Sequence, residues 1–229
     1  MPDNAGIRPA PKSEETRQRI LRAALKLFQE RGFDAATMRD IAEEAGMATG
    51  AAYYYFPSKD AIVMEFYRQS SAEMQPKLEA ALEQAGSLDQ RLYALTRVKW
   101  DHFGPHRGVL RTLLRNGADP AYPLSPFSSE TREIRAVDIE WFRRSLADCG
   151  VRIPKDLAAH LPDLLWFVQM GAIYFWVIDE SPKQVNSERL LAIATKSISA
   201  WIRISALPLM RPVRKAVLEV FQMVKGTAS

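Results

Sequence analysis

The sequence predicts an all-helical protein with a short N-terminal module and a larger helical body. Apolar residues recur at helical spacing in segment after segment, and no two strand-like segments are joined by a hairpin signal. Most of these segments also end at a glycine or a proline, the residues that stop helices. With 229 residues, 47% of them hydrophobic and 25% charged, the chain is long and apolar enough to bury a core.

Residues 1–12 are predicted to form a flexible arm, because three prolines stand there without apolar periodicity. The arm lacks the apolar core of a signal peptide. The first helix then begins at Ser13, a capping residue followed by two glutamates in the first turn. It ends at Gly32, and its inner face is formed by Ile20, Leu21, Ala24, Leu25, Leu27 and Phe28.

Two short helices are predicted next. Thr37 and Asp40 have the spacing of a capping box that opens the second helix, and Gly46 ends that helix after about two turns. A third helix over 49–56 begins a few residues later, and Ser58 caps the one that follows. A short helix, a glycine turn and another short helix form the helix-turn-helix pattern. The sequence therefore places a three-helix module at 13–60.

In a helix-turn-helix the second helix of the pair lies in the DNA major groove and presents its N-terminal side chains to the bases. Charge alone does not identify such a module here. The chain has a net charge of +4, yet residues 1–60 hold nine basic and nine acidic residues. Between positions 8 and 26, six basic residues oppose two glutamates, so we expect phosphates to meet the arm and the first helix.

The stretch over 20–62 reads ILRAALKLFQERGFDAATMRDIAEEAGMATGAAYYYFPSKDAI and resembles the N-terminal module of the TetR-type transcriptional regulator family. The shared features are Gly-Phe after the first helix, Thr before the second, Ile-Ala-x-x-Ala-Gly, and Gly-x-x-Tyr-x-Tyr-Phe-x-Ser-Lys. The resemblance covers about a fifth of the chain. It implies a DNA-binding domain at 13–60 and a helical effector-binding and dimerisation domain at 61–229.

The resemblance also implies which residues contact DNA. Two at the start of the second helix would touch phosphates, four on the third helix would enter the groove, and two beyond them would hold the backbone. In that order they are Thr37, Arg39, Thr49, Gly50, Ala51, Tyr53, Tyr54 and Lys59. The alternatives are solvated surface charges for Arg39 and Lys59, and core packing for Tyr53 and Tyr54.

The third helix departs from the family at its start. The family commonly has Ser-Lys before the glycine, whereas this chain has Ala48 and Thr49, which removes a capping hydroxyl and a cation. Thr49 can still donate a hydrogen bond, and Ala51 can pack on a thymine methyl group. Tyr55 and Phe56 are expected in the core.

Beyond the module, proline and glycine positions delimit the predicted helices of the body. The first ends before Pro76, and a loop over 117–129 contains three prolines. The helices are predicted over 58–72, 87–103, 106–116, 128–148, 154–178 and 187–206, with a final one after Pro212.

The segment Leu161–Ile178 is apolar nearly all round, so it must be covered on several sides. Its apolar run over 164–178 is shorter than the roughly 20 residues of a membrane span, so a buried helix is predicted rather than an anchor. In the resembling family the last two long helices pair with those of a second copy as a four-helix bundle. The faces expected in that homodimer are Trp166, Phe167, Met170, Ile173, Tyr174 and Val177, with Leu190, Leu191, Ala194, Ile198, Trp201 and Ile202.

Repressors of this type usually release DNA when a small molecule enters the body. A small apolar or aromatic effector is expected, because apolar walls with a few polar tips suit such ligands. The alternative for each candidate residue is plain core packing. The candidates are Trp100, Phe103, His106, Trp166, Met170 and Tyr174.

No cofactor, metal or enzymatic activity is predicted. His102 and His106 have a chelating spacing, but a glycine and a proline between them break the helical face. No catalytic triad, phosphate loop or carboxylate pair stands out. The single cysteine, Cys149, forms no intrachain disulfide, which favours the reducing cytoplasm.

Two functions therefore fit the sequence. The first is a repressor that binds a palindromic operator as a dimer and is released by an effector. The second is a helical small-molecule-binding or interaction protein of the same architecture without specific operator binding, favoured by the missing lysine before Gly50 and by the balanced charge of 1–60.

Overall fold

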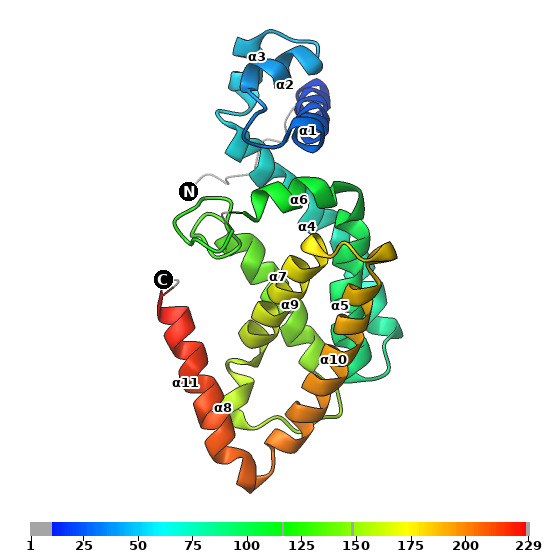
Figure 1. Ribbon diagram of the computed structural model, residues 1–229, viewed down its shortest axis with the longest axis vertical. Coiled ribbons are helices and arrows are strands. Elements are labelled where there is room, and N and C mark those ends of the chain that lie inside the picture. Colours follow the sequence, from blue (N-terminus) through cyan, green and yellow to red (C-terminus); the bar gives the residue numbers. More distant parts are fainter. Residues whose placement is uncertain (1–10, 116, 148, 228–229) are drawn as a thin grey trace, which may run out of the picture. The chain divides into compact units, whose positions relative to one another are not determined.

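The computed structural model describes residues 11–115, 117–147 and 149–227, and this part of the chain contains helices and turns but no strand (Figure 1). The all-helical prediction is therefore confirmed. An arm was predicted over 1–12, and residues 1–10 of it lie outside the described part of the chain. The helices are α1 (Pro11–Arg31), α2 (Met38–Glu44), α3 (Thr49–Tyr55), α4 (Lys59–Gln84), α5 (Leu88–Phe103), α6 (Arg107–Leu113), α7 (Arg132–Leu146), α8 (Lys155–Ala158), α9 (Leu161–Ile178), α10 (Val185–Ser205) and α11 (Arg211–Thr227).

The chain forms two compact units, Met1–Phe66 and Tyr67–Ser229. In the first unit α1, α2 and α3 pack around a common core. Its fully buried side chains come from all three helices, from the turn before α2 and from the start of α4: Ile20, Ala24, Ala36, Ile41, Ala42, Ala52, Ile62 and Val63. Helix α1 begins at Pro11 rather than at the predicted cap Ser13, because proline suits the first turn of a helix, where its missing N–H has no partner to lose.

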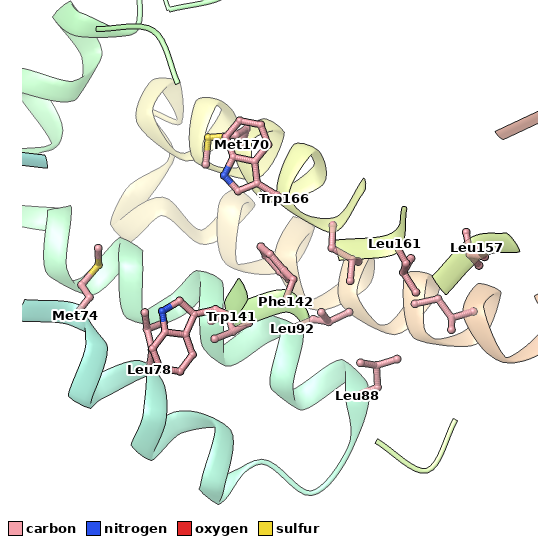
Figure 2. Close-up of a cluster of buried hydrophobic side chains, with 13 residues drawn as sticks. Met74, Leu78, Leu88, Leu92, Trp141, Phe142, Leu157, Leu161, Trp166 and Met170 are labelled. Atoms are coloured by element: carbon pink, nitrogen blue, oxygen red, sulfur yellow. The ribbon is translucent and has the colours of Figure 1, made fainter. Parts of the chain in front are cut away.

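In the second unit α9 packs against α5, α6, α7, α8 and α10 (Figure 1). The main apolar cluster runs from Met74 and Leu78 on α4 through Trp141 and Phe142 on α7 to Trp166 and Met170 on α9 (Figure 2). A second cluster gathers around Trp100 and Trp176, whose rings stack with centroids 5.8 Å apart.

The sequence predicted that this helix ends before Pro76. Helix α4 instead continues through Pro76 to Gln84. Proline removes one backbone donor and normally breaks a helix. Here Met74 and Leu78 are both buried in the main cluster, one on each side of the proline. Burial of both turns therefore holds the helix together across the missing hydrogen bond.

The helix predicted over 154–178 is in fact two helices, α8 and α9, separated at Ala159 and His160. Pro162 stands in the first turn of α9, where its lack of an N–H costs nothing, so it starts a helix instead of continuing one. Helix α7 begins at Arg132, later than predicted. The hydroxyls of Ser128 and Thr131 bond to the carbonyls of Pro123 and Ser125 in the preceding turns.

Helix α9 is long and apolar enough to cross a bilayer, with a mean hydropathy of 1.4 over 18 residues. The apolar run over 164–178 was predicted to be too short to span a membrane. The whole helix passes the length test because it begins three residues before that run, at Leu161. The two helical segments Pro182–Ser205 and Pro208–Met223, which meet at an angle of 111°, pass the same test only when they are counted as one span. Core helices of globular proteins share this composition, and α9 is packed against five other helices.

Candidate nucleic-acid interface and internal cavity

A reciprocal capping box opens α2, as the sequence predicted. The Thr37 hydroxyl oxygen accepts from the backbone N–H of Asp40 (3.1 Å), and the Asp40 carboxylate accepts from the backbone N–H (2.9 Å) and the hydroxyl (2.5 Å) of Thr37. These bonds to the Thr37 hydroxyl and backbone lower the pKa of Asp40. The one hydroxyl proton of Thr37 is thus directed to Asp40.

Helix α3 follows a turn at Gly46, where a φ of 65° favours glycine. Ala48 precedes the helix without a side-chain cap, as its methyl group requires. Ala52 and Phe56 are buried and anchor the helix, whereas Tyr53 is 50% exposed and Tyr54 84% exposed. Gly50 and Ala51 are also exposed, Thr49 is half-buried, and Tyr55 is half-buried. The predicted groove residues are thus brought together on the outer side of one helix.

Lys59 is tied to the turn between α1 and α2. Its Nζ donates to the backbone carbonyls of Phe33 (2.6 Å) and Asp34 (3.3 Å) and lies 4.6 Å from the centre of the Phe33 ring. This role was not predicted, because it depends on residues 25 and 26 positions away. Arg39, by contrast, is exposed and makes no hydrogen bond or ion pair with the described part of the chain.

Arg17 fixes the end of α3 and was missed by sequence reasoning. Its guanidinium donates to the backbone carbonyl of Tyr55 (3.3 Å), forms an ion pair with Glu65 (3.2 Å) and lies over the Phe56 ring. Because these contacts join α1 to the C-terminal end of α3, Arg17 is a positioning residue for the exposed face. No local pattern signals it.

The second unit contains a cavity of about 110 Å³. Four of the six predicted effector residues line it: Phe103, Trp166, Met170 and Tyr174. Trp100 and His106 do not. Trp100 is instead stacked on Trp176, and burial lowers the pKa of the half-buried His106. The remaining lining residues are Tyr67, Ser71, Met74, Lys99, Leu110, Leu114, Pro126, Thr131, Ile134, Arg135, Asp138 and Ile173.

Two cations stand in the wall of this cavity. The Lys99 ammonium pairs with the Asp138 carboxylate at 2.5 Å, and both side chains are largely buried. The Arg135 guanidinium donates to the carbonyls of Pro126 (2.6 Å) and Ser128 (3.0 Å) and lies 5.8 Å from the centre of the Trp166 ring. Sequence reasoning missed all three charged residues, since their grouping arises from the packing of α5 against α7.

The predicted dimer face needs a correction. Trp166, Met170 and Val177 of α9 are buried within the chain itself, as are Leu191 and Ile202 of α10. When a helix is apolar on several sides, its sequence does not show which side packs inside the chain and which side faces a second copy. The large apolar side chains that remain exposed on these two helices are Val168, Phe175, Ile178, Val185, Leu190, Ile193 and Ile204.

Comparison with known proteins supplies two family matches. Residues 20–66 match the model of bacterial regulatory proteins of the tetR family, and residues 91–219 match a tetracyclin repressor-like C-terminal domain.

Curated relatives are matched over part of their length. An uncharacterized HTH-type transcriptional regulator YerO of Bacillus subtilis is 35% identical over 46% of this chain and 37% of the relative. The HTH-type transcriptional regulator UidR of Escherichia coli is 25% identical over 47% of this chain and 55% of the relative. The chain thus spans about half the length of these relatives. The HTH-type transcriptional repressor KstR2 of Mycolicibacterium smegmatis is 26% identical over 62% of this chain and 70% of the relative.

Solved structures share the fold over most of the chain. A TetR-family regulator structure from Syntrophomonas wolfei aligns with a TM-score of 0.65 at 19% identity, covering 82% of this chain and 96% of the other. One from Streptomyces coelicolor aligns with a TM-score of 0.64 at 19% identity, covering 90% and 89%.

Proposed function

Because this chain belongs to the tetR family of bacterial regulatory proteins, we propose that it represses transcription by binding a palindromic operator as a homodimer. A small organic effector releases it from the DNA. The organisation into a DNA-binding domain and a helical effector-binding domain is part of this proposal, as is its action in the cytoplasm. It is not an enzyme in this proposal.

One observation carries the DNA-binding role: the exposed face of α3. Gly50, Ala51, Tyr53 and Tyr54 are open to solvent, while Ala52 and Phe56 on the same helix are buried in the core. Tyr53 and Tyr54, which are 50% and 84% exposed, are adjacent and together place two aromatic rings on this exposed face. The face therefore suits the groove, where Thr49 donates a hydrogen bond and Ala51 meets a thymine methyl group.

Phosphate contacts complete the interface in this proposal. Arg39 is exposed and has no ion pair in the described part of the chain, so its guanidinium is available to a phosphate. Lys59 has three donors and uses two of them on backbone carbonyls, which leaves one for DNA. Thr37 offers its hydroxyl oxygen only as an acceptor and so holds α2 in place beside these contacts.

The homodimer is supported by the exposed apolar side chains of α9 and α10. Val168 and Phe175 on α9, with Leu190 and Ile193 on α10, would lose water contact against a second copy. Two modules held by one interface read two half-sites of a palindrome.

The effector role is supported by the cavity, whose lining is mainly apolar with a few polar groups. A ligand that binds only one arrangement of the dimer shifts the population away from the DNA-bound one. For regulation, the ligand must bind the DNA-bound arrangement of the dimer and the DNA-free arrangement with different affinities.

The test is fluorescence anisotropy of the full chain with labelled DNA from upstream of its own gene, against a scrambled duplex, over a salt series. We expect selective binding that weakens steeply as salt rises, since phosphate contacts release counterions. Further genomic fragments extend the test if the first is not the operator. Unselective or absent binding to all of them would contradict the proposal and favour a helical interaction protein.

A further inference from the structure

The cavity in the second unit carries more positive than negative charge. Its lining contains two cations, Lys99 and Arg135, and one carboxylate, Asp138. The Asp138 carboxylate is committed to Lys99 at 2.5 Å. Arg135 forms no direct ion pair with the described part of the chain, although the Asp163 carboxylate exerts a favourable Coulombic interaction on it. The hydrogen-bond acceptors of Arg135 are the neutral oxygens of Pro126, Ser128 and Thr131. The Arg135 charge in the cavity wall therefore has no carboxylate in direct contact.

An unpartnered hydrogen-bond donor stands beside that charge. Trp166 is only 2% exposed, and its Nε1 finds no acceptor within the described residues. The Arg135 guanidinium lies 5.8 Å from the centre of the same indole ring. An indole N–H can only donate, and a buried donor left unpaired carries a desolvation cost. Figure 2 shows the Trp166 ring next to Met170 on α9, another residue of the cavity wall.

We infer that the cavity binds a small apolar carboxylate, held with its carboxylate group at the end formed by Trp166 and Arg135. This inference rests on the proposed effector role of the cavity. The ligand carboxylate accepts the Trp166 N–H and places a negative charge in direct contact with Arg135. Its apolar part lies along Phe103, Met170 and Ile173.

The same groups select against other ligand classes. A cationic group at this end would be repelled by Arg135 and could not accept the Trp166 N–H. A neutral amide of the same shape can accept the N–H but gains no charge attraction from Arg135. The cavity volume of about 110 Å³ is of the same order as the roughly 150 Å³ of an empty cavity that accommodates benzene, so acids with one ring or a short chain are suitable probes.

The experiment is calorimetric titration of the full chain, without DNA, with hexanoate, octanoate, phenylacetate and phenylpropionate and with the amide of each. We expect at least one carboxylate to bind about tenfold or more tightly than its amide. Equal affinity for each acid and its amide, or binding of none of the acids, would overturn the inference.

Variants locate the carboxylate end. Trp166→Phe removes the N–H and keeps an aromatic ring, so it should lower the ratio of acid to amide affinity. Trp100→Phe is the matched control, because Trp100 is also buried with an unpartnered Nε1 but lies outside the cavity lining. Arg135→Gln should lower the ratio and Arg135→Lys should largely retain it. An unchanged ratio in both Trp166→Phe and Arg135→Gln would contradict the assignment.

The outcome is separable from the proposed function. Selective binding of acids by a chain that binds no operator would leave the ligand class standing and remove the repressor role. If neutral molecules alone release the protein from its operator, the repressor role stands and the carboxylate ligand class is wrong.

Discussion

The Lys99 ammonium on α5 and the Asp138 carboxylate on α7 form an ion pair in the cavity wall, with Nζ and Oδ2 2.5 Å apart. Removing one partner of a buried pair leaves an uncompensated charge away from water. We therefore expect Lys99→Met to lower the free energy of unfolding by about 3–5 kcal/mol in urea denaturation. The double variant Lys99→Met with Asp138→Leu should recover most of that loss, and a double variant as unstable as the single one would contradict this account.

The exposed tyrosine of α3 gives a prediction on DNA binding. Tyr54→Ala should weaken binding to the operator and to scrambled DNA by similar factors, because a backbone contact reads no sequence. Its unfolding midpoint should stay unchanged, since Tyr54 is 84% exposed. Gln29→Ala, an exposed position on α1, serves as the control with unchanged binding.

Thr49→Ala, in contrast, should change which operator bases are preferred, because it removes a donor proposed to face the groove. Selection from a randomised duplex pool measures this preference. A Thr49→Ala protein that selects the same sequences as the unaltered chain would remove Thr49 from base recognition.

The corrected dimer face gives a third prediction. Ile193→Asp places a charge in the proposed interface and should convert the dimer to a monomer in light scattering. Leu209→Asp is the matched control, because Leu209 is 86% exposed but lies outside α9 and α10, so its dimer should persist. A dimeric Ile193→Asp protein would exclude this face. Trp166→Asp would instead disrupt the core, because Trp166 is buried within the chain.

The carboxylate of Asp179 links stability to pH. It accepts from the Ser187 hydroxyl (2.5 Å) and backbone N–H (2.8 Å) and from the Ser181 backbone N–H (2.9 Å), and these bonds lower its pKa. A carboxylate with a lowered folded-state pKa stabilises the protein above its unfolded-state pKa of about 3.9, and this stabilisation is lost as pH falls towards the folded value.

Asp179→Asn should therefore be less stable than the unaltered chain at neutral pH. The difference in unfolding free energy should be constant above about pH 5 and shrink below about pH 4. Urea denaturation over this pH range measures it, and a difference that grows on acidification would show that the charged form is not the stabilising one.

The first unit could be predicted from sequence in detail because its signals are local. Thr37 with Asp40 and the glycine turn at Gly46 specify the ends of their helices within a few residues. The same argument failed at Pro76, where a local helix-breaking rule was outweighed by the burial of Met74 and Leu78.

The cavity was only half predictable for a related reason. The preference of small ligands for apolar and aromatic walls identified Phe103, Trp166, Met170 and Tyr174, but it could not separate them from Trp100, whose ring stacks on Trp176. Five residues predicted for the dimer face, Trp166, Met170, Val177, Leu191 and Ile202, are instead buried within the chain, whereas Leu190 is exposed as that prediction requires. Because α9 is apolar on every side, only the packing of α5, α6, α7, α8 and α10 around it decides which of its sides is free.

Pro76 has a kinetic consequence. Proline has no N–H to donate to the carbonyl four residues earlier, so α4 lacks one backbone hydrogen bond. The missing bond lies at the turn that carries Ser71 and Met74, which both line the cavity. A helix opens most easily where such a bond is missing, and such opening is recorded by the exchange of amide hydrogens with solvent. Amides near Pro76 should therefore exchange faster than those of α5, and the same transient opening would loosen the part of the cavity wall that Ser71 and Met74 form.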